Sequence, residues 1–140
     1  MNVPFETAKK LKDVGICLFC DSAYVTNNNQ WPEGILIHNQ NDDLFWFREI
    51  SSNDYVYAPT IDDVIKYFRD ESMYNIIATH YWYKSEMCWQ YTIYDLGFPP
   101  STIIISETNG EYDDWEDAII GAINRVLDEL IYLKLQIIKL

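Results

Sequence analysis

The residues of this 140-residue chain best suited to chemistry are its three cysteines and two histidines. Cys17 and Cys20 have the Cys-x-x-Cys spacing of a zinc or redox pair. A structural zinc site needs four ligands, usually from two such pairs, and the sequence has no second pair. A thioredoxin-like pair begins a helix after a strand, whereas this pair follows a helical pattern. We therefore expect core thiols, with no metal and no cofactor.

His80 lies inside a predicted strand and His38 at the end of another. General acid or base catalysis requires a carboxylate or a nucleophile held close by, and nothing in the spacing of Glu86 or Asp95 requires either to approach His80. The sequence contains no glycine-rich phosphate loop, serine nucleophile elbow or paired-histidine metal motif. We predict that the protein is not an enzyme. The alternative is a small-ligand binder or an unrecognised enzyme that uses His80.

The formal net charge is −12, from 22 acidic and 10 basic residues. Such a charge repels nucleic-acid phosphates and anionic membranes, so direct nucleic-acid binding is not expected. Most acidic runs fall at predicted helix ends or hairpin turns, where capping and solvation account for them. A second interpretation is an acidic surface that imitates DNA phosphates and inhibits a host nuclease or defence protein.

Aromatic residues are abundant, with eleven Tyr, five Trp and six Phe. Residues 76–83 and 87–94 are rich in aromatic and β-branched side chains and are separated by a short polar segment, which predicts a hairpin. Both faces of this hairpin are partly apolar, so it is either covered on both sides or presents an aromatic surface to a partner. Tyr and Trp are common interface anchors. The candidate binding residues are Tyr81, Trp82, Tyr83, Trp89 and Tyr91.

Three helices must position these residues. A short helix starts near Pro4 and stops before Gly15, which is the usual punctuation at a helix end. A second helix begins after Thr60, a good N-cap, and its apolar residues recur at i, i+3, i+4 and i+7. A third begins at Asp113, with Glu116 three residues later as the capping partner.

The strands complete an α+β fold. Residues 35–38 and 44–47 flank a polar turn and predict a first hairpin, while 103–105 is a plausible last strand. Residues 16–26 are either a strand or a buried connection. We predict a single α+β domain over residues 1–140, in the order α-β-β-α-β-β-(β)-α. Its one mainly antiparallel sheet, built from two hairpins, is covered by helices on one face.

The last helix is apolar in more than one stripe. A helix of this kind on a small domain either lies in a deep groove or extends its tail against another chain. Burial within its own subunit and a homodimer contact are both compatible with the pattern. The candidate dimer residues are Leu130, Leu133 and Ile137.

The sequence also limits the cellular context. The N-terminus lacks the basic start and apolar run of a signal peptide. No apolar stretch approaches the roughly 20 residues needed to span a bilayer. Three cysteines, an odd number, fit a reducing compartment. We expect a cytoplasmic protein without a membrane partner.

Three segments carry a resemblance to a known family. They are residues 3–12, residues 57–69 with the motif Tyr-Ala-Pro-Thr-Ile-Asp-Asp-Val, and residues 115–123. Together they resemble small uncharacterised proteins from phages and mobile elements of gut bacteria. The chain departs from that family's Lys-His-Gly type of turn at residues 70–74. The resemblance implies an α+β scaffold and a phage or mobile-element origin, and it brings no known activity or catalytic residue.

These observations together predict a phage or mobile-element accessory protein that acts by binding a host or phage protein. A homodimer through the last helix is a further expectation.

Overall fold

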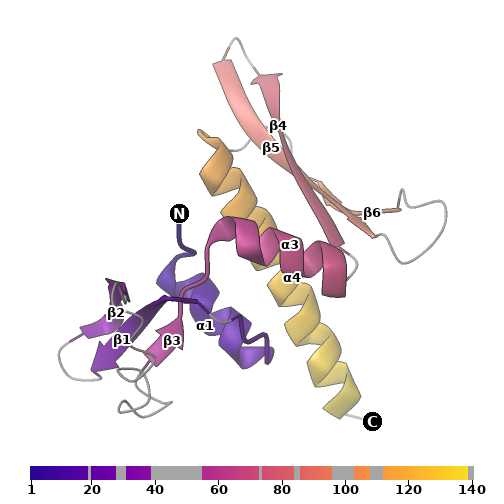
Figure 1. The fold of residues 1–140 in the computed structure, drawn as a ribbon. Helices are drawn as coiled ribbons and strands as arrows, with labels where there is room; N and C mark the ends of the chain where they lie inside the picture. Colours follow the sequence, from indigo (N-terminus) through magenta and orange to yellow (C-terminus); the bar gives the residue numbers. More distant parts are fainter. Residues whose placement is uncertain are drawn as a thin grey trace. The chain divides into compact units, whose positions relative to one another are not determined.

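The computed structural model of this protein describes residues 1–18, 20–27, 31–38, 55–72, 74–83, 86–95, 103–107 and 112–138, and the statements below concern these residues. They form two units, Met1–Thr60 and Ile61–Leu140, each with its own three-stranded sheet (Figure 1). The first unit contains α1 (Phe5–Asp13), β1 (Ser22–Asn27), β2 (Trp31–His38) and β3 (Tyr55–Tyr57). The second contains α3 (Ile61–Glu71), β4 (Tyr74–Tyr83), β5 (Glu86–Asp95), β6 (Ile103–Glu107) and α4 (Trp115–Ile138). The α+β class and the predicted order of elements are confirmed.

The strands form two antiparallel sheets, β2-β1-β3 and β4-β5-β6, instead of the single sheet that the sequence predicts. The first hairpin also differs, because β2 pairs with β1, placing Ala23 opposite Ile37. These two strands are three residues apart along the chain, so their pairing closes a short loop at low entropic cost. The predicted partner of β2, residues 44–47, lies outside the described residues. Pro32 is tolerated in β2 because this strand lies at the edge of the described sheet.

The C-terminal end of α1 is closed by a Schellman turn. Gly15 has a φ angle of +82°, and its N–H donates to the carbonyl of Lys12 at 3.0 Å. The N–H of Ile16 donates to the carbonyl of Leu11 at 2.9 Å. This pair of bonds satisfies two carbonyls that the helix end leaves open, and glycine adopts the required left-handed conformation without strain. The predicted role of Gly15 is confirmed.

The first unit is held together where the start of the chain meets β3 and the residues after it. The N–H of Val3 donates to the carbonyl of Pro59 at 2.9 Å, and the N–H of Ala58 donates to the carbonyl of Ser22 at the same distance. The hydroxyl of Tyr24 donates to the carbonyl of Val3 at 2.8 Å. Val3 and Ala58 are fully buried, so these bonds satisfy backbone groups that water cannot reach.

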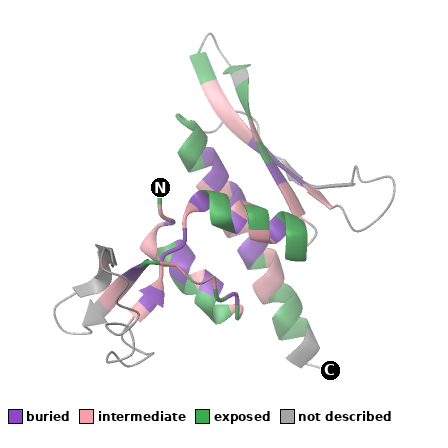
Figure 2. Cartoon of the chain, in the orientation of Figure 1, coloured by how far each residue is buried: buried purple, intermediate pink, exposed green. Residues whose placement is uncertain are grey.

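The core of the second unit lies between its helices and one face of its sheet. Helix α4 contacts β4 and β5, and α3 contacts β4. The buried positions of α4 recur with the period of a helix and face the sheet (Figure 2). The largest fully buried side chains of this unit are Phe68, Ile93, Ile119, Ile123 and Leu127. Because these side chains come from both helices and the sheet, the layers stabilise one another by apolar burial.

The start of α4 is fixed by Asp114 and not by Asp113, the residue that the sequence predicts. The Asp114 carboxylate accepts a hydrogen bond from the backbone N–H of Asp117 at 2.8 Å, and the helix begins at Trp115. The reason lies upstream, where Tyr112 is still paired with Trp89 in a β-bridge. The chain turns over the next two residues, so the second of them becomes the N-cap.

Candidate functional site

The β4–β5 hairpin has one face on which most side chains are apolar or aromatic. Alternate residues of a strand share a face, and directly opposite residues of paired strands lie on the same side. The pairs on this face, from base to tip, are Tyr74 with Asp95, Ile76 with Ile93, Ala78 with Tyr91, His80 with Trp89, and Trp82 with Met87. We call it the inner face, because α3 and α4 cover its base, and we call His80, Trp82, Met87 and Trp89 the aromatic tip.

Burial changes sharply along this inner face. Ile76 and Tyr91 are each 6 % exposed, whereas Trp82 is 67 % exposed and Met87 44 %. The hairpin extends past the first turn of α4, and the exposed end of the hairpin is visible beyond the helix (Figures 1 and 2). The aromatic tip is therefore a continuation of the core face without the helix that covers the core.

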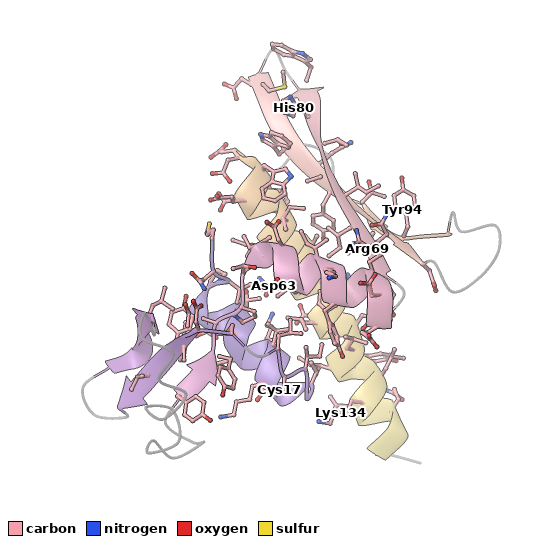
Figure 3. The ribbon with its side chains drawn as sticks, in the orientation of Figure 1. Cys17, Asp63, Arg69, His80, Tyr94 and Lys134 are labelled. Carbon is pink, nitrogen blue, oxygen red and sulfur yellow. The ribbon has the colours of Figure 1, made fainter. Side chains whose placement is uncertain are left out.

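The aromatic tip is well anchored. The rings of His80 and Trp89 meet edge to face, with centroids 3.9 Å apart and planes at 75°, and Figure 3 shows His80 toward the far end of the hairpin. On the other edge of β5, the N–H of Trp89 donates to the carbonyl of Tyr112 at 2.8 Å, and the N–H of Tyr112 donates back at 3.2 Å. Trp89 is therefore held on both edges of β5, by His80 on β4 and by Tyr112.

The opposite face of the hairpin is mixed, because it carries the exposed Ile77 as well as polar pairs. Gln90 donates from its amide nitrogen to the hydroxyl of Thr79 across the strand pair at 3.4 Å. On the inner face at the tip, Trp82 and Met87 are both exposed and lie directly opposite each other. Exposed contiguous apolar residues of this kind are typical of interaction surfaces.

Carboxylates lie along the chain next to the aromatic tip. Glu86 begins β5 and is exposed beside Met87. The chain that leaves the Trp89–Tyr112 bridge carries four exposed acidic residues within one short segment, together with Trp115, which is 37 % exposed. These residues are Asp113, Asp114, Glu116 and Asp117. The exposed apolar residues of the tip are thus accompanied along the chain by acidic residues.

The structure separates the five aromatic residues that the sequence groups together. Trp82 and Trp89 belong to the aromatic tip, but Tyr91 is buried under α4 and packs near Tyr112, with ring centroids 6.0 Å apart. Tyr91 is thus a core residue and not part of a binding surface. Tyr81 and Tyr83 occupy β4 positions that alternate with Trp82, and their side chains lie outside the described part of the structure.

Sequence reasoning missed Met87 and Trp115 as exposed apolar residues. The sequence predicts strands 76–83 and 87–94, which would place Met87 opposite Tyr83, whereas the structure starts β5 one residue earlier and places Met87 opposite Trp82. No local signal marks Trp115, since its exposure depends on where α4 crosses the sheet.

The catalytic alternative based on His80 requires a carboxylate or a nucleophile held close to the ring. His80 is exposed, and among the described residues no carboxylate forms a hydrogen bond or ion pair with it. Its close contact is the Trp89 ring. Glu86 is six positions along the hairpin and pairs with Tyr83 at the turn.

The cysteine pair lies in the first unit. Cys17 is exposed after the end of α1 (Figure 3), while the Cys20 thiol lies 3.1 Å from the carbonyl of Ser22, to which it donates. Within the described ranges, no group of three or more potential ligands is arranged to hold a metal ion. Cys17 therefore departs from the expectation of a buried core thiol.

The candidate dimer residues lie on the second half of α4. Leu130 is half-buried, Leu133 is 44 % exposed, and the side chain of Ile137 lies outside the described part. Tyr132 and Leu135, on the same turns, are each more than half exposed. Despite this apolar character, no helix in the described ranges has the combination of length and hydrophobicity that crossing a bilayer requires.

Comparison with known proteins identifies no similar protein. No protein-family model matches the chain, and no curated protein or solved structure matches it.

Proposed function

We propose that this protein acts by binding another protein through the aromatic tip of its β4–β5 hairpin. The observation that carries the proposal is the exposure of Trp82. Its side chain is 67 % exposed, although it belongs to a strand that is paired with β5 along its whole length. Covering the exposed part of a Trp side chain contributes on the order of 2–3 kcal/mol to association. Met87 opposite it and Trp89 beside it enlarge the same apolar contact.

The partner that this surface fits carries an apolar pocket bordered by basic groups. The carboxylates of Glu86 and of residues 113–117 lie next to the aromatic tip along the chain and would meet those basic groups at the rim. The resemblance to phage and mobile-element proteins supports a host or phage protein as the partner. Rim charges mainly raise the association rate, whereas the aromatic contact determines how long the complex lasts.

Phosphate mimicry is the competing proposal, since the same carboxylates supply the charge that a DNA-mimic inhibitor needs. The two proposals differ in their dependence on salt. A complex held mainly by carboxylates against a basic groove weakens steeply as salt rises, and nucleic acid competes for the groove. A complex held by Trp82 survives moderate salt, because apolar burial is not screened.

The test is capture of the tagged protein's partner from host lysate at low and moderate salt, with wild type, Trp82→Ala and Ile77→Ala compared. Ile77 is 40 % exposed on the same strand but at an alternate position, so it serves as the matched control. We expect one stoichiometric protein to remain bound to wild type and Ile77→Ala at moderate salt and to be lost with Trp82→Ala. Equal retention by all three variants would contradict the proposal, and loss from wild type at moderate salt would favour phosphate mimicry.

A second candidate is self-association through the end of α4, and the exposure of Leu133 together with Leu135 supports it. An α-helix that is apolar on several sides and only partly covered gains free energy by pairing with a second copy. Sedimentation velocity of wild type and Leu133→Lys tests this idea. We expect wild type to form dimers at micromolar concentration and the variant to be monomeric. A wild-type protein that remains monomeric in this range would exclude the homodimer.

A further inference from the structure

The first unit contains a pocket that is independent of the aromatic tip. It lies between the end of α1, the segment that follows the Schellman turn, and β3, and its volume is about 230 Å³. Its walls are mostly apolar, formed by residues that include Leu11, Ile16, Leu18, Val56 and Pro59. Leu11, Ile16 and Val56 are buried side chains, so the walls are part of the packed core of this unit.

The size of the pocket limits what can occupy it. An apolar cavity of about 150 Å³ accommodates benzene, whereas sites for drug-sized molecules usually begin at about 300 Å³. A volume of about 230 Å³ therefore suits a single ring with a short substituent. A larger ligand would have to project into solvent.

The charge of the lining is the opposite of the charge of the protein. Lys12 lines the pocket, and no aspartate or glutamate is among the described residues that do so, although the chain as a whole carries −12. The Lys12 ammonium donates to the carbonyl of Tyr55 at 3.2 Å, which holds the cation against β3. An ammonium carries a full positive charge, so it attracts an anionic group placed beside it.

Two tyrosines also belong to the lining of the pocket. The rings of Tyr55 and Tyr57 meet edge to face, with centroids 5.4 Å apart. Burial, followed by the hydrogen bond with Tyr55 and repulsion from nearby groups that can become anionic, raises the pKa of Tyr57 to about 12. A ring inserted between the apolar walls would meet aromatic surface and a fixed cation.

We propose that this pocket binds a small molecule that combines one apolar ring with a carboxylate or a similar anionic group. The ring occupies the apolar interior, and the anionic group lies beside the Lys12 ammonium at the edge. A charge-assisted hydrogen bond of this kind provides both affinity and orientation.

Benzoate and benzyl alcohol are suitable probes, because they share the ring and differ in charge. Their binding to the full-length protein is measured by saturation-transfer NMR and calorimetry. We expect benzoate to bind more tightly than benzyl alcohol. Lys12→Gln should weaken benzoate binding by about tenfold and leave benzyl alcohol unchanged, since it removes one charged hydrogen bond. Lys12→Arg, which keeps the charge, should retain most of the benzoate affinity.

Lys9→Gln is the matched control. Lys9 is on the same helix and its substitution changes the net charge equally, but its ammonium lies 3.7 Å from the Glu6 carboxylate and over the Phe5 ring, and it does not line the pocket. We expect this variant to bind benzoate like wild type. Equal weakening by Lys9→Gln and Lys12→Gln would overturn the proposed contact, because it would show only a general effect of charge.

Two further measurements place the ligand in the pocket. Ala8, which is 1 % exposed and lines the pocket, can be changed to Leu to fill it, and binding of both probes should then be lost. In wild type, where folding is not in question, benzoate should slow the modification of Cys17 by a thiol reagent but not that of Cys88, as peptide mapping would show. No saturation transfer to either probe, or no protection of Cys17, would overturn the proposal.

Discussion

The base and the tip of the β4–β5 inner face are built from similar residues and have opposite surroundings. At the base, Ile93 is 1 % exposed beneath α4. At the tip, three pairs farther along the same face, Trp82 is 67 % exposed. Both belong to the same continuous antiparallel ladder. Burial of a residue on this face therefore depends on whether α4 crosses the sheet above it, and not on the composition of the strands.

The place of that crossing has two local causes. The Trp89–Tyr112 bridge keeps the chain extended on the edge of β5, and the Asp114 cap then starts α4 at Trp115. Helix α4 thus begins beside the middle of the hairpin and runs toward its base. The aromatic tip is left uncovered because no residue of α4 precedes Trp115.

The largest expected difference between base and tip is in stability. Ile93→Ala at the base should lower the free energy of unfolding by about 2–5 kcal/mol, because it leaves a cavity in a packed core. Trp82→Ala at the tip should change it by less than about 0.5 kcal/mol, because the side chain is mostly in water. Urea unfolding followed by circular dichroism measures both. A Trp82→Ala loss as large as that of Ile93→Ala would show that the tip is covered.

The contact between α4 and Tyr112 is the next test. A Cβ atom at Gly121 would lie 2.7 Å from the Tyr112 ring carbon Cζ, so Gly121→Ala forces the ring to shift. We expect a loss of about 1–3 kcal/mol from overpacking, even though Ala favours a helix interior over Gly by about 1 kcal/mol.

The matched experiment repeats Gly121→Ala in a Tyr112→Ala background, where the obstacle is gone. There we expect the same substitution to stabilise the protein by up to about 1 kcal/mol. If Gly121→Ala stabilises the otherwise wild-type protein, then α4 does not approach Tyr112 as closely as the structure shows.

The cap of α4 should contribute a smaller amount. Asp114→Ala removes the acceptor of the Asp117 N–H and should cost about 1 kcal/mol of unfolding free energy. Asp113→Ala, one residue earlier and equally exposed, serves as the control and should cost much less. Thermal unfolding of the two variants at the same pH compares them. A larger effect at Asp113 would restore the cap position that the sequence predicts.

The smallest expected effect is a loss of stability at alkaline pH. It arises from Tyr74, at the base of the β4–β5 hairpin. Burial, followed by repulsion from Asp95 and Glu129, raises the pKa of Tyr74 above its usual 10.0. The unfolded chain therefore releases this phenolic proton at a lower pH than the folded protein does. The stabilisation is complete below a pH of about 10 and is lost as the pH rises through the pKa of the folded state.

Tyr74→Phe should remove the contribution of this residue to the loss of stability at alkaline pH. Tyr132→Phe, at a position that is 56 % exposed, should leave that loss of stability unchanged. Unfolding temperatures of the two variants and wild type across the alkaline range provide the measurement. Three parallel curves would show that Tyr74 does not contribute to the effect.

Much of the fold follows from local patterns. The end of α1 at Gly15, the start of α3 after Thr60 and the hairpin of β4 and β5 are all predicted correctly, because each depends on neighbouring residues. The pairing of β1 with β2 is missed, because residues 16–26 carry no clear period. The cap at Asp114 is missed by one residue, since its position depends on a bridge to a strand more than twenty residues away.

The candidate site could be predicted only in part. The sequence identifies the hairpin and its aromatic content, but its predicted strands end and begin one residue off the true register, so it does not pair Trp82 with Met87. It could not separate Tyr91 from Trp82, because both are aromatic residues at inner-face positions of the same ladder. Their environments differ only through the helix that packs above one of them.

The sequence by itself therefore determined the presence of the helices, the end of α1, the start of α3, the β4–β5 hairpin and the strong negative charge, since all of these arise from residue type and short-range spacing. Only the tertiary structure decided which apolar residues are core and which are surface, because burial requires a second element to exclude water from the first. The same reason applies to the pocket of the first unit, where residues from α1, the following turn and β3 enclose a space that none of them forms alone.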